Sequence, residues 1–328
     1  MNEVIIGIDL GGTRLRAARF DRELNLLVRD EVLTHAEQGP HETIERMKQM
    51  ITEMLPTDGT RVGGIGISAP GPSNPYTGVV VAPPNLPGWI NIPLVKMLED
   101  TFHVPVYLGN DANVAALAEV ARGAAPNARD AIFITVSTGI GGGVVTDGRL
   151  LLGREGLGAE VGHMIMIVEE GRVSTLEKEA AGPALARQAR TRIEGGEASI
   201  MRDMVNGDLS RIDGKVVGIA AGQGDKLAVA IVQRAGRILG MGMVTLLHVF
   251  NPEYLVFGGG VSNIGDLLFD PMREAMRENV ISPAYIDGLK VEMALLGDNV
   301  SLVGAAALVI TKGGIEDVTA AMAKLEGE

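Results

Sequence analysis

A segment made of a strand, a glycine turn and a second strand occurs twice in this chain, about 130 residues apart. The two copies are Val4–Ile8, Asp9–Thr13 and Leu15–Phe20, and Ala131–Val136, Ser137–Gly143 and Val144–Val145. Repetition of one supersecondary unit indicates a duplicated architecture. The sequence therefore predicts two related α/β domains that face each other.

Both turns combine glycines with a threonine, a composition suited to phosphate. Because Gly11 and Gly12 lack a Cβ, backbone N–H groups there can approach a phosphate closely, and Thr13 can add a hydroxyl donor. Asp9 could hold Mg²⁺ through water. The alternative is a tight β-turn without a ligand. Neither turn is a Rossmann fingerprint or a P-loop, since Val144 occupies the last glycine position of the second turn and no Gly-Lys-Ser/Thr follows either one.

The stretch Tyr107–Asn113 brings a carboxylate to the end of a strand. Val104–Leu108 is predicted to be a buried strand, and Ala112–Ala121 an alanine-rich helix with apolar residues at helical spacing. Asn110 and Asp111 then lie at a strand-to-helix corner, where ligands bind in open α/β sheets. The commoner explanation of such a pair is capping, in which a side chain accepts hydrogen bonds from the first free amides of the helix. Both roles stay open on this stretch alone.

Glu160 and His163 stand three residues apart. On a helix they would share a face and form half a metal site. However, Gly158 and Gly162 interrupt a regular helix, and two ligands are too few for a metal. The remaining interpretations are a polar pair that binds a sugar and a structural hydrogen-bonded pair.

Further segments complete the pattern. The segment Tyr76–Ile92 is rich in proline and glycine and can wall a cleft, although a hairpin packed on the sheet is commoner around a lone tryptophan such as Trp89. Strand Tyr254–Phe257 runs into three glycines, and Ser301–Leu308 opens a small-residue helix against which a flat adenine ring can lie. Helical spacing also predicts helices at His41–Leu55, Leu176–Arg192, Leu227–Phe250 and Pro271–Asn279.

Composition excludes several classes of protein. The chain has 328 residues, enough for two domains, and its formal net charge of -12 gives no basic field for nucleic acid or an anionic membrane. It contains no cysteine, which rules out disulfides and thiolate zinc sites and fits a reducing cytoplasm. We expect no secretory signal before the first strand, and we expect apolar stretches to be interrupted before about 18 residues, the length of a membrane span. We therefore expect a soluble cytoplasmic protein.

The order of these motifs resembles the ROK family (repressor, open reading frame, kinase) of the actin-like ATPase superfamily, and within it the bacterial glucokinases. The resemblance covers essentially the whole chain. It implies an α/β fold in which two actin-like ATPase (ribonuclease H-like) domains flank a cleft. Residues 1–112 and 305–328 would form the smaller N-terminal domain, closed by the C-terminal helix, and residues 113–304 the larger C-terminal domain. A homodimer is also implied.

The resemblance further implies the function of an ATP-dependent hexokinase-type phosphotransferase, a glucokinase acting on the 6-hydroxyl of glucose. The nucleotide would be bound by Asp9, Gly11, Gly12, Thr13, Thr138, Gly139, Gly141, Gly259, Gly260 and Gly304. The sugar would be bound by Asn85, Asn110, Asp111, Glu160, His163 and Glu177. Asp111 would be the catalytic base, and Asp9 would bind Mg²⁺ through water.

One departure from the family concerns zinc. Zinc-bearing members carry three cysteines in a loop after the Glu-x-x-His pair, whereas the corresponding segment here, Val168–Glu177, has none and is shorter. We therefore expect no zinc. Two alternatives remain: a kinase for fructose, mannose or an N-acetylated amino sugar, and a non-catalytic sugar-responsive regulator. The regulators of this family carry a helix-turn-helix segment before the first strand, for which we expect no room here, because that strand begins at Val4.

Overall fold

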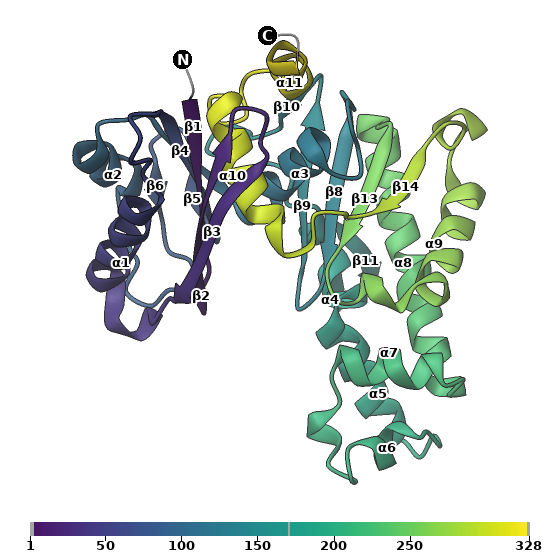
Figure 1. The fold of residues 1–328 in the computed structure, drawn as a ribbon. Coiled ribbons are helices and arrows are strands. Elements are labelled where there is room, and N and C mark those ends of the chain that lie inside the picture. Colours follow the sequence, from purple (N-terminus) through teal and green to yellow (C-terminus); the bar gives the residue numbers. More distant parts are fainter. Residues whose placement is uncertain (1–2, 170, 327–328) are drawn as a thin grey trace. The chain divides into compact units, whose positions relative to one another are not determined.

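The computed structural model describes residues 3–169 and 171–326, and the chain packs into two compact units. Unit 1 comprises Met1–Phe133, Gly143–Ala159 and Glu292–Glu328, and unit 2 comprises Ile134–Gly142 and Glu160–Val291. Figure 1 labels the elements of both. This division by packing differs from the predicted domains, in which residues 113–304 form one body. The domain boundaries after residues 112 and 304 stay a prediction.

Unit 1 is built on a five-stranded sheet in the order β3-β2-β1-β4-β7. The strands are β1 (Glu3–Leu10), β2 (Arg14–Asp21), β3 (Leu26–Leu33), β4 (Arg61–Ala69) and β7 (Val106–Asn110). β1 pairs with β2 and β2 with β3 in antiparallel fashion, whereas β1, β4 and β7 run parallel. The first predicted strand, turn and strand is thus a β-hairpin. The carboxyl ends of the three parallel strands meet at one edge of the sheet.

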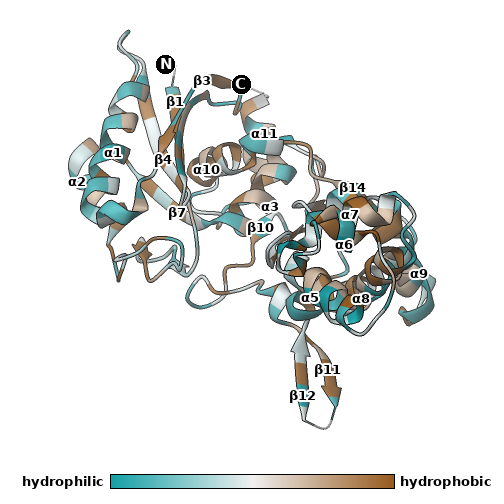
Figure 2. Ribbon diagram, turned by 90° about the horizontal axis from the view of Figure 1, so that it is seen from below, coloured by the Kyte–Doolittle hydropathy of each residue, from teal (hydrophilic) through white to brown (hydrophobic). Residues whose placement is uncertain are grey.

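Helices cover both faces of this sheet, which is why β1 is apolar and buried along nearly its whole length. α1 (Gly39–Met54) and α2 (Leu94–Phe102) lie on one side of the sheet, and α10 (Val300–Ile310) lies on the other (Figure 2). α1 buries Ile44, Met47 and Ile51, the residues that its periodicity places on one face. The same core contains Trp89, so the lone tryptophan packs inside unit 1.

Glycines let α10 lie close to its neighbours in unit 1. A Cβ on Gly66 of β4 would collide with the backbone of Ala305, and one on Gly304 would collide with the backbone of Val114. The second contact joins α10 to α3 (Asp111–Arg122), the helix that follows β7. Unit 1 also contains the short strands β5 (Ser73–Asn74) and β6 (Val79–Val80) and the terminal helix α11 (Val318–Glu326).

A second five-stranded sheet has the order β10-β9-β8-β13-β14. Its strands are β8 (Ala131–Val136), β9 (Ile140–Thr146), β10 (Arg149–Leu150), β13 (Tyr254–Gly258) and β14 (Lys290–Met293). In both sheets the strands therefore follow the order third, second, first, fourth, fifth, as expected of a duplication. The second predicted hairpin is present, but its strand begins at Ile140 and not at Val144. Glycines at 141–143 belong to β9, because extended backbone needs no side chain to form a ladder.

Unit 2 is mainly helical outside its strands. Its helices are α4 (Leu176–Ala180), α5 (Gly182–Glu194), α6 (Met201–Met204), α7 (Gly214–Gly222), α8 (Lys226–Phe250) and α9 (Asp266–Asn279). The helical region predicted over 176–192 is thus two helices, which meet at Ala181 in an extended conformation. The hairpin of β11 (Ile165–Glu169) and β12 (Arg172–Thr175), which the sequence patterns did not predict, projects from the rest of unit 2 (Figure 2).

The long helix α8 is a core element of unit 2. A Cβ on Gly236 or Gly240 would strike the backbone of α9, so these glycines permit close approach, as predicted. Among the described helices, α8 is also the one whose length and apolar composition would suffice to span a membrane, and most of its apolar window is buried inside the protein. The expectation that no apolar stretch reaches that length is wrong for α8, because its glycines and arginines do not end the helix.

Candidate active site

Three candidate residues lie at the edge of unit 1 where its parallel strands end. Asp9 is paired in register with Ser68, and Ala69 with Asn110, so the last residues of β1, β4 and β7 are neighbours. Asp111 follows directly as the first residue of α3. Edges of this kind are where open α/β sheets bind ligands. The fold therefore brings Asp9, Asn110 and Asp111 together, and their roles in binding and catalysis stay predictions.

Asn110 and Asp111 divide the roles that the sequence left open. Asn110 is the N-cap of α3, and its Oδ1 accepts a hydrogen bond from the amide of Asn113 at 2.7 Å. The side chain of Asp111 is exposed and its Oδ1 accepts from the amide of Ala112 at 2.8 Å. Capping thus belongs to Asn110. Asp111 is left at the rim of the helix, where it can contact a ligand.

The surroundings make Asp111 a stronger base than an ordinary aspartate. Part of Asp111 is open to solvent, but protein atoms surround most of its carboxyl group, and this desolvation raises the pKa of Asp111 most. The nearby negative charge of Asp9 raises it further. The hydrogen bond from the amide of Ala112 acts in the opposite direction, because it stabilises the ionised form. A raised pKa is a common property of carboxylates that accept protons in catalysis.

Asp9 is not a free carboxylate. It is only 7% exposed, and its Oδ2 accepts hydrogen bonds from Nε of Arg16 at 2.8 Å and from Nη2 at 2.6 Å. Burial raises the pKa of Asp9, and the charge of Arg16 opposes that rise. Arg16 also donates from Nη1 to the carbonyl oxygen of Asp298, just before α10. The sequence analysis missed Arg16, although hairpin register pairs it with Asp9 across β1 and β2.

A magnesium ion fits Asp9 only in part. Among the described residues, no group of three or more His, Cys, Asp and Glu side chains could hold a metal. One oxygen of Asp9 is committed to Arg16, and the hydroxyls of Ser68 and Ser301 also interact with this buried carboxyl group, so an ion would reach it only through water. Because Mg²⁺ normally keeps several waters and takes the rest of its ligands from substrate phosphates, a single protein carboxylate is compatible with binding as a metal–nucleotide complex.

The first glycine turn lies against a predicted sugar contact. A Cβ on Gly12 would be 2.8 Å from the carbonyl oxygen of Asn85 and 3.1 Å from its Cβ. The turn itself is closed by the amide of Gly11, which donates to the carbonyl oxygen of Arg14 at 2.9 Å. Thr34 also stabilises the turn, because its Oγ1 donates a hydrogen bond to the carbonyl oxygen of Gly11 at 2.6 Å. Thr13 is exposed at the tip.

The second glycine turn, in unit 2, is held by a carboxylate. The amide of Ile140 donates to Oε2 of Glu177 at 2.9 Å, and a Cβ on Gly139 would lie 2.5 Å from the same oxygen. Glu177 belongs to the short helix α4. The structure therefore joins two residues of the predicted sites, Gly139 and Glu177, that are far apart in the sequence. Thr138 is exposed next to them.

Glu160 precedes a single turn of 3-10 helix, Val161–His163, and His163 is its last residue. The amide of His163 donates to the carbonyl oxygen of Glu160 at 3.1 Å, and both side chains are exposed. In the part of the chain that the structure describes, their side chains do not hydrogen-bond each other. Both side chains are open to solvent, and a sugar-binding role for the pair stays a prediction.

In the third glycine run, Gly258–Gly260, neighbouring glycines have different surroundings. Gly259 has φ +88, and a Cβ there would clash with the backbone of Val136, so glycine is required for packing. A Cβ on Gly260 would have no atom within 4 Å. Gly260 therefore faces open space beside the end of β13. Gly304, by contrast, is buried in unit 1, where its packing against α3 gives it a structural role.

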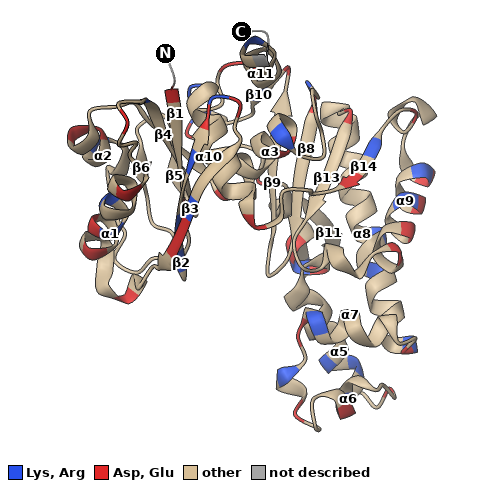
Figure 3. Cartoon of the chain, viewed as in Figure 1, with Lys and Arg blue, Asp and Glu red and all other residues tan. Residues whose placement is uncertain are grey.

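The open space beside Gly260 is a cavity of about 890 Å³ inside unit 2. Apolar side chains of α5, α7 and the segment after β13 form much of its wall, and Thr138 of the second glycine turn also lines it. Arg190 of α5 and Lys215 of α7 add positive charge, and in Figure 3 the blue segments of the ribbon mark basic residues in this helical region. Size, apolar walls and a few cationic groups match what a nucleoside phosphate requires.

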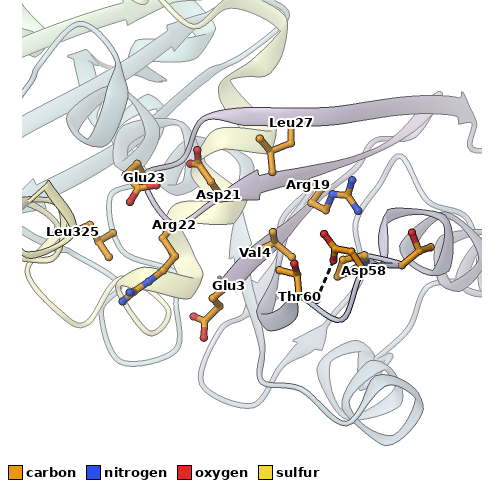
Figure 4. A pocket seen from close by; sticks show the side chains of 12 residues that line it. Glu3, Val4, Arg19, Asp21, Arg22, Glu23, Leu27, Asp58, Thr60 and Leu325 are labelled. Atoms are coloured by element: carbon orange, nitrogen blue, oxygen red, sulfur yellow. Dashed lines mark hydrogen bonds between the residues drawn. The ribbon is translucent and has the colours of Figure 1, made fainter. Parts of the chain in front are cut away.

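A second cavity, of about 670 Å³, lies at the opposite edge of the first sheet. Figure 4 shows its lining, which mixes basic side chains such as Arg19 and Arg22 with acidic ones such as Glu3 and Asp21. Glu3 and Val4 begin β1, whereas Asp9 stands at its other end, about 17 Å away at the rise of a β-strand. This cavity is therefore separate from the candidate active site.

Comparison with known proteins agrees with this geometry. The ROK family matches residues 5–312. The chain belongs to the ROK family. Among curated relatives, a glucokinase from Thermotoga maritima is 33% identical over 310 residues, covering 93% of this chain and 96% of the relative. A xylose repressor from Caldicellulosiruptor bescii is 30% identical over 253 residues, covering 76% of this chain and 62% of the repressor.

Solved ROK structures share the fold. A ROK hexokinase from Thermus thermophilus has a TM-score of 0.77 at 34% identity, covering 92% of this chain and 97% of the other. A ROK glucokinase from Streptomyces griseus, solved with glucose and AMPPNP, has a TM-score of 0.72 at 34% identity, covering 93% of this chain and 98% of the other. The predicted actin-like ATPase fold is confirmed. These relatives also support the ATP-dependent sugar kinase that the motifs predicted.

Proposed function

We propose that this ROK protein transfers the γ-phosphoryl group of magnesium ATP to the 6-hydroxyl of glucose. The observation that carries the proposal is the state of Asp111. Its neighbour Asn110 takes over capping, its own side chain is exposed where three parallel strands end, and its pKa is raised. These are the properties expected of a base that accepts the proton of a sugar hydroxyl.

In this mechanism Asp111 accepts the hydroxyl proton while the sugar oxygen attacks the γ-phosphorus in line. General-base assistance contributes roughly 10² to 10⁴ in rate. Positioning and charge stabilisation supply most of the rest, because phosphoryl transfer leaves little covalent work for the protein. The amides of Gly12 and Gly139 and the hydroxyls of Thr13 and Thr138 would hold the phosphates, while the amide of Gly11 closes the first turn.

Magnesium, when bound with ATP, would neutralise charge on the phosphates. Asp9 would hold its water shell, and Arg16 would keep Asp9 ionised and fixed for that purpose. No zinc is part of the proposal, since the chain has no cysteine. We place the nucleoside in the cavity of unit 2, with Gly260 leaving room for it and Gly141 and Gly259 shaping the adjoining strands.

The sugar would be held by Asn85, Asn110, Glu160, His163 and Glu177. Amides and carboxylates can distinguish equatorial from axial hydroxyls by geometry. Exclusion of water from the bound sugar and nucleotide would keep water from competing as the phosphoryl acceptor. We further propose a homodimer that works in the cytoplasm, in the first step of glucose use, without nucleic acid or membrane.

A coupled assay of ADP release tests the proposal. Glucose, fructose, mannose, N-acetylmannosamine and N-acetylglucosamine are compared at saturating magnesium ATP, and the highest kcat/KM names the substrate. We expect glucose to be preferred. A higher kcat/KM with another sugar would leave a kinase of different specificity. Sugar binding without turnover of any sugar would support the alternative of a sugar-responsive regulator. The xylose repressor among the relatives motivates this alternative.

A further inference from the structure

Glu177, which hydrogen-bonds the second glycine turn, belongs to a helix that is too short to be stable by itself. α4 contains five residues, Leu176–Ala180, and is flanked by β12 and by the extended residue Ala181. Isolated helices of this length are unstable, because forming the first turn fixes several residues for a single hydrogen bond. The direction in which Glu177 points must therefore be set by contacts that α4 makes with other parts of unit 2.

The strongest of those contacts are made by Glu179, which is buried on the same helix. Its Oε1 accepts a hydrogen bond from Oγ of Ser174 at 2.6 Å and another from Nη2 of Arg172, both on β12. Its Oε2 accepts from Nη2 of Arg234, on α8, at 2.5 Å. We refer to Arg172, Ser174, Glu179 and Arg234 as the Glu179 cluster.

Two arginines and a serine stabilise the ionised form of the Glu179 carboxyl group. Burial by itself would favour the neutral acid, but hydrogen bonds from Ser174, Arg234 and Arg172 outweigh it and lower the pKa of Glu179 to about 2. Hydrogen bonds between ionised groups are short and roughly twice as strong as neutral ones. The carboxylate thus joins three elements of unit 2: strand β12, helix α4 and helix α8.

Glu177 and Glu179 point to different sides of α4. Each residue advances about 100° around a helix, so two positions correspond to about 200°. Glu179 faces β12 and α8, and Glu177 faces the turn between β8 and β9, where its carboxylate accepts from the amide of Ile140. A rotation or shift of α4 that relaxed the Glu179 cluster would therefore move Glu177 away from this amide.

We propose that Glu179 is a positioning residue, which fixes α4 through Arg172, Ser174 and Arg234 so that Glu177 holds the Ser137–Ile140 turn in place. This inference rests on the proposed function for the consequence in catalysis, since Glu177 is there a sugar contact and Thr138 a phosphate contact. Its structural half, the coupling of Glu179 to the amide of Ile140, does not depend on any reaction. No other role in the proposed reaction falls to these four residues.

The first experiment measures exchange of the Ile140 amide by NMR in the protein without ligands. Glu179→Gln keeps the shape of the side chain, removes its charge, and should accelerate that exchange at least about tenfold. The matched control is Glu197→Gln, which removes a carboxylate from the exposed pair of Glu197 with Arg192 in the same unit. The control should leave Ile140 unchanged.

The second experiment uses a double-mutant cycle in kcat/KM for the sugar. We expect Glu179→Gln and Glu177→Gln each to lower kcat/KM at least fivefold, and the double variant to equal Glu177→Gln alone, because Glu179 acts through Glu177. Ser174→Ala removes one neutral donor and should act in the same direction, about twofold. It serves as the test if Glu179→Gln does not fold.

The outcomes separate the possibilities. If Glu179→Gln lowers Tm but leaves the exchange of Ile140 as in Glu197→Gln, Glu179 only stabilises the hairpin, and the inference is wrong. If the double variant lowered kcat/KM by the product of the two single effects, Glu179 and Glu177 would act independently, and the inference would again be wrong. If the parent protein phosphorylates no sugar while Ile140 exchange still accelerates in Glu179→Gln, the proposed function fails and the coupling of Glu179 to the turn stands.

Discussion

The two glycine turns have similar sequences but are held in different ways. In unit 1, Gly12 of the first turn packs against the backbone of Asn85, and the carboxylate of Asp9 beside it is fixed by Arg16 on the next strand. In unit 2, Gly139 and Ile140 of the second turn contact the carboxylate of Glu177, which α4 presents. The first turn is held by backbone packing and one buried ion pair, and the second by a side chain.

This difference suggests that the two turns respond differently to substitution. A turn packed on backbone can move only if the chain moves, whereas a turn packed on a carboxylate can push a side chain aside. Unit 1 also contains the proposed base, Asp111, at the edge where Asp9 lies. We therefore expect changes in unit 1 to cost more than equivalent changes in unit 2.

The largest effect is expected at Asp111. Asp111→Ala should reduce kcat by about 10² to 10⁴ while sugar and nucleotide still bind, because the hydroxyl proton loses its acceptor. Steady-state kinetics and calorimetric binding measure the two parts separately. Asp111→Asn is the conservative companion. Since the pKa of Asp111 is raised in the folded protein, ionised Asp111 opposes folding at neutral pH, and Asp111→Asn should not lower Tm. Activity above about a tenth of the parent would exclude the base role.

Next in size is the effect of breaking the ion pair of the first turn. Arg16→Met should lower the free energy of unfolding by about 3 kcal/mol, because it leaves the carboxylate of Asp9 buried without its partner. Urea denaturation measures this. Arg14→Met is the matched control on the same strand, since Arg14 pairs with Glu31 in an exposed position and should contribute less than about 0.5 kcal/mol. Equal losses in both variants would show that the pair does not fix Asp9.

Sequence reasoning found the elements of the first turn and missed what fixes them. The hairpin and the corner at Asn110 follow from short apolar runs and glycines, which report local structure. Arg16 was not predicted, although the register of the hairpin pairs it with Asp9, because a glycine pattern reports the turn and not the side chain on the opposite strand. That signal is in the sequence and can be used.

The support of the second turn could not be found in this way. Glu179 gains its partners from β12 and from α8, and Arg234 is 55 residues away in the chain. The helical pattern over 176–192 also concealed the break at Ala181, because both halves have helical residues. Contacts between elements depend on tertiary packing, which periodicity does not encode. The hairpin of β11 and β12 was also missed, although its strands are neighbours in sequence and Gly171 between them has φ +75, which is a local turn signal.

The third prediction compares the glycines directly. Gly12→Ala should raise KM for the sugar about tenfold, or about 1.4 kcal/mol, because the new Cβ would lie 2.8 Å from the backbone oxygen of Asn85 and displace that segment. Gly139→Ala should raise KM only about threefold, since its Cβ meets the end of the Glu177 side chain. Gly195→Ala, at an ordinary φ of -72 with its nearest atoms at 3.4 Å, is the control. A larger effect at Gly139 would reverse the proposed difference between the turns.

The smallest effect is a shift in pH dependence that links Asp9 to Asp111 within unit 1. Because Asp111 must be ionised to accept a proton, kcat/KM should fall as the pH is lowered through its raised pKa, at a higher pH than for an ordinary aspartate. Asp9→Asn removes a negative charge that contributes to the rise, so the pKa of Asp111 and the acidic limb should move to lower pH.

Turnover in Asp9→Asn should also fall if Asp9 holds the magnesium water shell. Titration of the ¹³C-labelled Asp111 carboxyl group by NMR therefore gives its pKa without relying on turnover. Asp21→Asn, at the open end of the β1–β2 hairpin away from the turn, is the control and should leave the titration unchanged. If Asp111 titrates at the same pH in the parent and in Asp9→Asn, desolvation alone raises the pKa of Asp111, and the charge of Asp9 does not influence it.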